Sequence, residues 1–166
     1  MLTPLLRWLL TPLFLLLVQN SVAQSCEVTN DALQAMGKAQ VIFTNTDGSQ
    51  QKFQVKLADN LTTRAAGFQR VCASTIAAEP ILFVFDTERR PRFHMRNVVA
   101  PIDIAFINKA GAIDSILAMQ PYVLGSTKRP LYAPRDKVVA ALEVHPGFYD
   151  QHGIDQSTTV RWQVSP

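Results

Sequence analysis

The apolar run from Ile81 to Phe85 constrains the fold of this chain more than any other segment. No polar residue interrupts the run, and Pro80 and Asp86 bound it. A short apolar run that contains valine and phenylalanine and lies between turn-forming residues is typical of a strand with both faces buried. The run therefore predicts a strand that is covered on both sides.

Two other predicted strands, 102–107 and 138–144, each carry one acid among apolar residues. Because side chains alternate between the two faces of a strand, Asp103 and Glu143 each interrupt a face that is otherwise apolar. An enclosed carboxylate stays charged only beside a cation or a hydrogen-bond donor, since its desolvation costs on the order of several kcal/mol. Arg96 lies near Asp103 in the sequence, so we expect arginine to be the partner.

Turn and helix signals complete the outline of the fold. Asp47 and Gly48 form a pair that is typical of a hairpin turn, so the strands on either side should pair antiparallel. Strands with few helices indicate an α+β fold, which we expect to be a mainly antiparallel, barrel-like sheet with one or two short helices. The remaining expected elements are strands at 41–44, 53–57, 112–119 and 158–163, a helix within 61–72, and a long loop over 121–135.

The first 23 residues are typical of a cleavable signal peptide. Arg7 supplies the positive charge, residues 8–18 form a leucine-rich segment too short to span a bilayer, and Ser21-Val22-Ala23 resembles a cleavage site. We expect cleavage after Ala23, an N-terminal leader over 24–38 and a single globular domain over 39–166. The mature protein would be periplasmic or secreted, without a stable membrane anchor.

The two cysteines, Cys26 and Cys72, both lie in the part that would be exported. In an oxidising compartment we expect them to form a disulfide, which would stabilise the fold by about 4 kcal/mol in the chain-entropy model. Two alternatives are a buried thiol at Cys72 with a free Cys26, and a lipoprotein acylated on Cys26. The residues just before Cys26 lack the leucine and small-residue pattern of a lipoprotein site.

The charge of the chain gives little indication of a partner. Removing Arg7 with the signal peptide lowers the formal charge from +3 to +2. This excess is too small to indicate nucleic acid or an anionic membrane. The basic run at 89–92 adjoins Asp86 and Glu88 and is interpreted as a solvated bend. We therefore expect no nucleic-acid partner.

Several motifs together resemble one protein family. They are Arg64-Ala-Ala-Gly67-Phe68-Gln-Arg70, Leu82-Phe83-Val84-Phe85, Phe93-His94-Met95-Arg96-Asn97, Pro101-Ile102-Asp103-Ile104-Ala105-Phe106 and Leu142-Glu143-Val144 with Gly147. In this order they are similar to the domain of unknown function 192, over about residues 53–162. The resemblance implies a small, often exported bacterial or archaeal domain, and it carries no established activity. His94 stands where the family usually has tryptophan.

Six polar residues make up the candidate site. They are Arg64, Arg70, Arg96, Asn97, Asp103 and Glu143. Two interpretations are open: a pocket in which arginines bind a polar or anionic ligand, and an ion-pair network that fixes the helix and a loop onto the sheet.

We expect a non-catalytic binding or accessory module with a small polar or anionic ligand or an envelope protein as partner. The alternative is a small envelope hydrolase that uses Asp103 and Glu143 as its two carboxylates. The histidines His94, His145 and His152 lack the spacing of a metal motif, so we expect neither a metal nor another cofactor.

Overall fold

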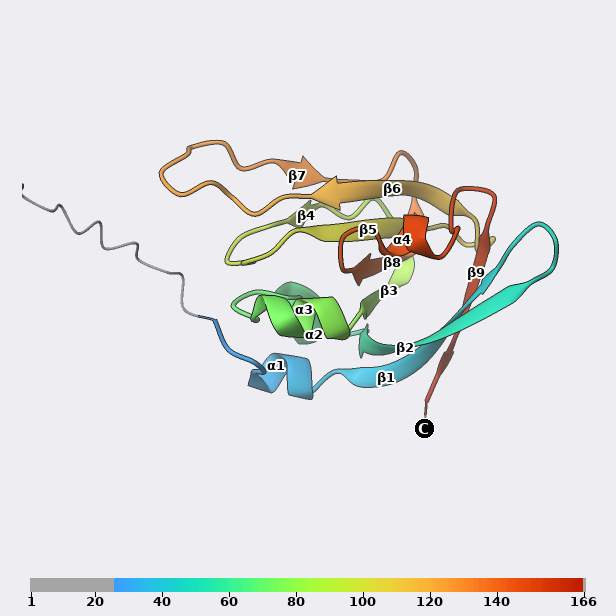
Figure 1. The fold of residues 1–166 in the computed structure, drawn as a ribbon, viewed down its shortest axis with the longest axis horizontal. Helices are drawn as coiled ribbons and strands as arrows, with labels where there is room; N and C mark the ends of the chain where they lie inside the picture. The colour runs from blue at the N-terminus through green and yellow to red at the C-terminus, as the bar shows by residue number, and fades with distance from the viewer. Residues whose placement is uncertain (1–25, 166) are drawn as a thin grey trace, which may run out of the picture.

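A computed structural model describes residues 26–165, so the expected signal peptide and its cleavage site lie outside the described residues. The chain forms one large sheet, one small sheet and short helices (Figure 1). In chain order the elements are α1 (Asp31–Gln34), β1 (Gly37–Thr44), β2 (Gln50–Ala58), α2 (Leu61–Ala66), α3 (Ala73–Ala78), β3 (Ile81–Arg89), β4 (Phe93–His94), β5 (Ile102–Ile107), β6 (Ile113–Met119), β7 (Leu131–Tyr132), β8 (Val138–Val144), α4 (Phe148–Gln151) and β9 (Thr159–Val164).

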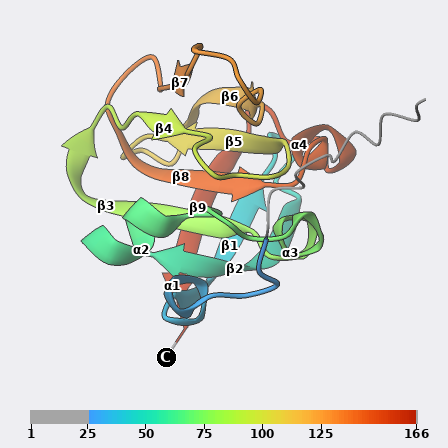
Figure 2. The ribbon, with the colours of Figure 1, turned by 90° about the vertical axis from the view of Figure 1, so that its left-hand side faces the viewer.

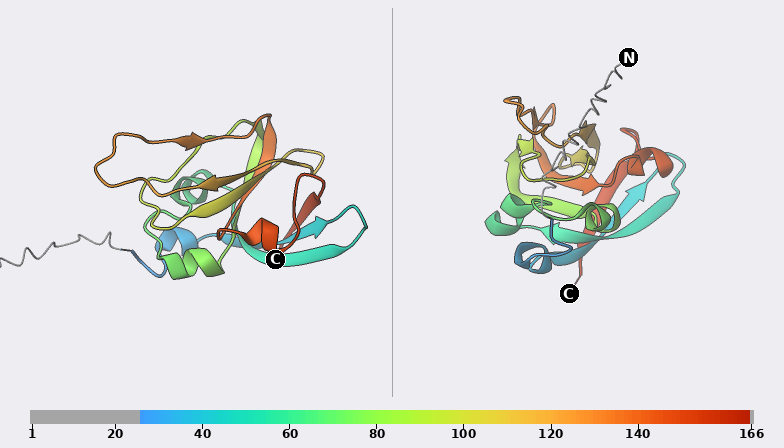
Figure 3. Two further views of the ribbon diagram at one scale, coloured as in Figure 1. Left: turned by 45° about the horizontal axis from the view of Figure 1, so that its top comes forward. Right: turned by 60° about the vertical axis from the view of Figure 1, so that its left-hand side comes forward.

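The large sheet has seven strands in the order β6-β5-β8-β3-β2-β1-β9. Neighbouring strands are antiparallel except for β2 and β3, which are parallel and are connected through α2 and α3. Strands β4 and β7 pair as a separate small sheet. The β1–β2 turn and the β6–β7 loop project from opposite ends of the molecule (Figures 1 and 3).

One face of the large sheet is covered by the helices α1, α2 and α3 and by the segment around β4 (Figures 1 and 2). The buried cluster on this face joins side chains of strands β3 and β5, such as Phe83 and Ile104, to Leu33 of α1 and Ile76 of α3. The expected inner strand is confirmed, because Ile81, Leu82 and Phe83 of β3 are almost completely buried. Helix α2 begins where Asn60 and Thr63 cap each other's backbone amides.

The other face of the sheet encloses a second buried hydrophobic cluster. Residues of β1, β2 and β9 pack in one buried cluster with residues of β5, β6 and β8, and Phe148 and Tyr149 of α4 close that cluster. The turn before edge strand β6 meets the other edge strand, β9, where the amide of Val160 donates to the carbonyl of Gly111 at 2.7 Å. A Cβ on Gly111 would lie 2.6 Å from the Val160 carbonyl oxygen, so this contact requires glycine.

The expected α+β class is therefore confirmed at the level of a mostly antiparallel sheet with short helices. The barrel-like part of the expectation is not confirmed: the sheet is open and mixed, and one isolated bridge, not a ladder, joins its edges. The described residues contain four short helices, where the sequence predicted one or two. In residues 26–165 no helix is both long and apolar enough to cross a bilayer.

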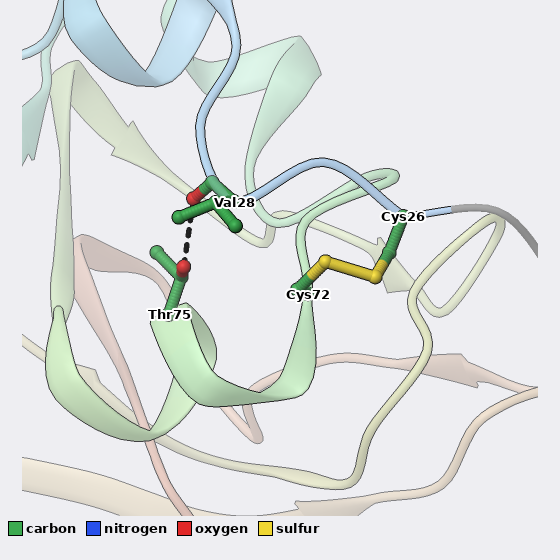
Figure 4. The surroundings of a disulfide bond; sticks show 4 residues. All are labelled: Cys26, Val28, Cys72 and Thr75. Atoms are coloured by element: carbon green, nitrogen blue, oxygen red, sulfur yellow. Dashed lines mark hydrogen bonds between the residues drawn. A yellow bond between two sulfur atoms is a disulfide. The ribbon is translucent and has the colours of Figure 1, made fainter.

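The expected disulfide joins Cys26 to Cys72 and fixes the start of the described chain to α3 (Figure 4). Hydrogen bonds continue the connection, because the Cys72 amide donates to the Glu27 carbonyl at 2.9 Å and the Thr75 hydroxyl donates to the Val28 carbonyl at 2.7 Å. The segment that precedes α1 is therefore held against the domain by covalent and hydrogen bonds.

Candidate functional site

A cavity of about 230 Å³ lies between the C-terminal end of α2 and strands β3 and β4. Phenylalanine side chains from three regions line it: Phe68 after α2, Phe83 and Phe85 of β3, and Phe93 of β4. The rings of Phe83 and Phe93 meet edge to face with centroids 5.1 Å apart. The walls of the cavity are thus largely aromatic.

Glu143 of β8 supplies the carboxylate of this cavity. Only 6% of its surface is exposed, and its carboxyl group makes no hydrogen bond or ion pair with any side chain or backbone group of residues 26–165. In the same residues no fully enclosed side-chain oxygen or nitrogen lacks a hydrogen-bond partner. The Glu143 oxygens therefore face the open space of the cavity.

The backbone of Gly67 lies close to this carboxylate. It ends α2 with a φ of 48°, in the region that favours glycine. A Cβ at this position would lie 3.9 Å from Oε2 of Glu143 and 3.6 Å from Cζ of Phe83. The turn after α2 therefore brings its backbone directly over the acid and an aromatic wall.

Burial among apolar side chains raises the pKa of Glu143 from 4.5 to about 8. The cause is desolvation, since no cation in the described chain pairs with the carboxylate. With this pKa the neutral carboxylic acid predominates near pH 7. A ligand group beside Glu143 can accept a hydrogen bond from the neutral carboxylic acid. A positively charged group can instead stabilise the ionised carboxylate.

Arg64, Arg92 and His94 provide the basic lining of the cavity. Arg64 is held in place, because its Nη1 donates to the carbonyls of Asp59 at 2.6 Å and Val84 at 2.8 Å. Its Nη2 lies 3.5 Å from the Asp86 carboxylate. Arg92 and His94 are exposed. The acid is thus buried, whereas two of the three basic side chains extend into solvent.

Asp103 lies elsewhere. In the β5–β8 ladder Asp103 pairs with Val144, and Ile104 pairs with Glu143, so Asp103 and Glu143 project from opposite faces of the sheet. Asp103 accepts a hydrogen bond at 2.7 Å from the amide of Gly147, which precedes α4. It makes no ion pair with an arginine among residues 26–165. Its observed role is to fix the turn after β8.

Arg70, Arg96 and Asn97 form a third location. Arg70 and Asn97 both have left-handed backbone, with φ of 62° and 56°, and the amide of Arg70 donates to the carbonyl of Asn97 at 2.7 Å. Arg96 and Asn97 line a separate groove with Tyr122 and Leu124. The six residues of the expected cluster thus divide among three places, and within residues 26–165 neither carboxylate forms the ion pair with arginine that we expected.

The sequence also matches the model of a protein family, DUF192, described as an uncharacterized ACR, over residues 42–162. The chain belongs to the DUF192 family. The resemblance predicted from the motifs is thereby confirmed.

Two solved structures are similar to this DUF192 protein. One, named as a candidate transcription regulator from Sinorhizobium meliloti 1021, is 24% identical with a TM-score of 0.63, and the match covers 76% of this chain and 95% of that one. The other, of unknown function from Novosphingobium aromaticivorans DSM 12444, is 23% identical with a TM-score of 0.60, covering 81% and 99%. At these identities the likeness shows the fold. No curated protein matches the sequence.

The described part of this DUF192 protein brings no three His, Cys, Asp or Glu side chains together where they would hold a metal ion. The cavity includes residues that the sequence analysis did not assign to a site, notably Arg92 and the phenylalanines Phe83 and Phe93. The sequence did contain two signals for this place. One was the basic run over 89–92, and the other was His94 at the family's usual tryptophan position.

Proposed function

We propose that this DUF192 protein is an exported, non-catalytic binding module that holds a small polar ligand in the cavity above Glu143. The observation that carries the proposal is the carboxyl group itself, which is almost fully buried, faces a cavity and has no partner in the described chain. Burying such a group without a partner destabilises a fold. A ligand that pairs with it offsets that cost, and perturbed acids of this kind concentrate at functional sites.

The geometry supports binding more than hydrolysis. A two-carboxylate glycosidase mechanism needs both acids beside one bond, about 5 to 10 Å apart. Asp103 and Glu143 lie on opposite faces of the sheet. Among the described residues that line the cavity, Glu143 is the single carboxylate, and none is a serine, threonine or cysteine. A second acid or a hydroxyl or thiol nucleophile is therefore missing from this lining.

Export is supported by the signal-peptide pattern of residues 1–23 and by the Cys26–Cys72 disulfide, since disulfides persist in oxidising compartments. Fractionation of the native host tests it. The mature protein should appear in the periplasm or the medium, and its intact mass should match a chain whose first residue is Gln24. Unprocessed protein that remains with the cytoplasm would contradict the proposal.

Binding is tested by thermal shift of the mature protein against amines, amino acids, sugars and small anions. We expect at least one class to raise the melting temperature of the wild type and to have no effect on Glu143→Gln. Asp103→Asn is the matched control, because it changes an acid on the other face of the sheet and should keep the response. If no compound gives a Glu143-dependent shift at millimolar concentration, the proposed function is wrong.

A further inference from the structure

The acidic and basic side chains that line the cavity differ in their exposure to solvent. Glu143 is 6% exposed, whereas Arg92 is exposed and the side chain of Arg64 is 16% exposed. Two backbone carbonyls and the Asp86 carboxylate engage the Arg64 guanidinium, which forms no ion pair with Glu143. Among residues 26–165 the Glu143 carboxyl therefore has no cation paired with it, and a ligand could supply one.

The walls suit such a cation. Four phenylalanines line the space, and the faces of aromatic rings attract ammonium groups while their surface buries methylenes. The exposed basic residues, by contrast, suit an anion, because a guanidinium binds a carboxylate through two parallel hydrogen bonds. The two ends of the cavity thus favour opposite charges.

We infer that the ligand is an amino-acid-like zwitterion, with an ammonium group against Glu143, a short apolar stem between the phenylalanines, and a carboxylate or similar anion at Arg92 and Arg64. This inference rests on the proposed function and names the ligand class of the same cavity. It predicts that affinity depends on the number of methylenes between the two charges.

The probes are the ω-amino acids from glycine to 6-aminohexanoate, each compared by titration calorimetry with the n-alkylamine and the n-alkanoate of equal length. We expect one chain length to bind most tightly. The affinity of that amino acid should exceed the affinities of the amine and the alkanoate of equal length by at least about tenfold, which is about 1.4 kcal/mol.

The number of protons released on binding shows which group of the ligand contacts the Glu143 carboxyl. An ammonium group stabilises the ionised carboxylate, so binding near pH 7 should release a proton and should tighten as the pH rises toward 8. A ligand that accepts a hydrogen bond from the neutral acid would instead release no proton near pH 7, where the carboxyl is already mostly protonated, and would take up part of a proton at pH 8. Titrations in two buffers with different ionisation enthalpies give the sign and the number of protons.

Other titratable groups near Glu143 are accounted for by variants. Arg64 and Arg92 stay charged at all these pH values. His94 also lines the cavity, and the control variant His94→Gln should keep the proton release. On the far side, the Tyr149 hydroxyl donates to the Leu142 carbonyl at 2.7 Å, and burial raises the pKa of Tyr149, which keeps it neutral.

Three variants complete the test. Glu143→Gln should abolish both the proton release and the binding of the alkylamines. Arg92→Gln should weaken binding of the amino acid by about tenfold and leave binding of the alkylamine unchanged, whereas Arg161→Gln, an exposed position on β9 outside the cavity lining, should change neither. Glu143-dependent binding without proton release near pH 7, or alkanoates that bind as tightly as the amino acids, would overturn this inference and leave the proposed function standing. Absence of any Glu143-dependent binding would overturn both.

Discussion

Asp103 and Glu143 occupy diagonal positions across the β5–β8 ladder and project from opposite faces of the sheet. Asp103 is bonded to a backbone amide, and Glu143 faces an aromatic cavity without a partner in the described residues. The two acids therefore have separate roles. One fixes a turn, and the other is available to a ligand.

Replacing Glu143 by glutamine should change how stability depends on pH. The pKa of Glu143 is raised by folding, so the folded state binds more protons than the unfolded state between about pH 4.5 and 8. The contribution of the Glu143 carboxyl to the free energy of unfolding is therefore fully present below the unfolded pKa and is lost as the pH rises through the folded pKa of about 8. The loss is at most about 5 kcal/mol. Glu143→Gln should be more stable than the wild type at pH 8.

Urea unfolding at pH 5 and pH 8 measures this difference. The free energy of unfolding of Glu143→Gln should vary less between the two conditions than that of the wild type. Asp103→Asn serves as the control and should retain the wild-type dependence. If the free energies of unfolding of the wild type and Glu143→Gln changed equally with pH, the buried carboxyl would not be the source of the pH dependence.

Truncation of Asp103 should loosen the turn before α4. The Asp103→Ala variant leaves the Gly147 amide without its carboxylate acceptor at 2.7 Å, so it should lose about 1.5 to 3 kcal/mol of stability. Asp103→Asn keeps an acceptor oxygen and should lose less. Chemical denaturation measures both, and an alanine variant as stable as the asparagine variant would contradict the assigned contact.

The contact between the sheet edges should depend on Gly111. Gly111 and Gly48 have the same φ of 83°, but a Cβ would meet the Val160 carbonyl oxygen at 2.6 Å in the first case and nothing within 4 Å in the second. Both alanine variants carry the cost of a left-handed residue. We expect Gly111→Ala to be less stable than Gly48→Ala by about 1 to 3 kcal/mol. Equal melting temperatures would argue against the close approach.

Removing the disulfide should destabilise the domain. The bond closes a loop of 46 residues, so the double variant Cys26→Ser, Cys72→Ser should lose up to about 4 kcal/mol in the free energy of unfolding. The control Thr75→Val removes only the hydrogen bond to the Val28 carbonyl and should lose about 1 kcal/mol. Urea unfolding compares them. A double variant no weaker than Thr75→Val would be inconsistent with the stabilising role.

Local patterns in the sequence anticipated much of the fold. The hairpin at Asp47 and Gly48 pairs β1 with β2 as expected, and the apolar run is the buried strand β3. The helix expected within 61–72 is shorter, because α2 ends at Ala66 before Gly67. The predicted loop over 121–135 contains the short strand β7, whose pairing with β4 is a long-range contact that no local pattern reveals.

The candidate site was less predictable for the same reason. Alternation along a strand correctly marked Asp103 and Glu143 as acids on apolar faces, but it gives no information on what covers those faces. A backbone amide, 44 residues away, covers Asp103 in place of an arginine. The sequence by itself determined the strands, the capped helix, the cysteine pair and the family. Only the tertiary structure decided which partners the charges meet, because the strand register and the path of α2 and β4 bring those groups together from distant parts of the chain.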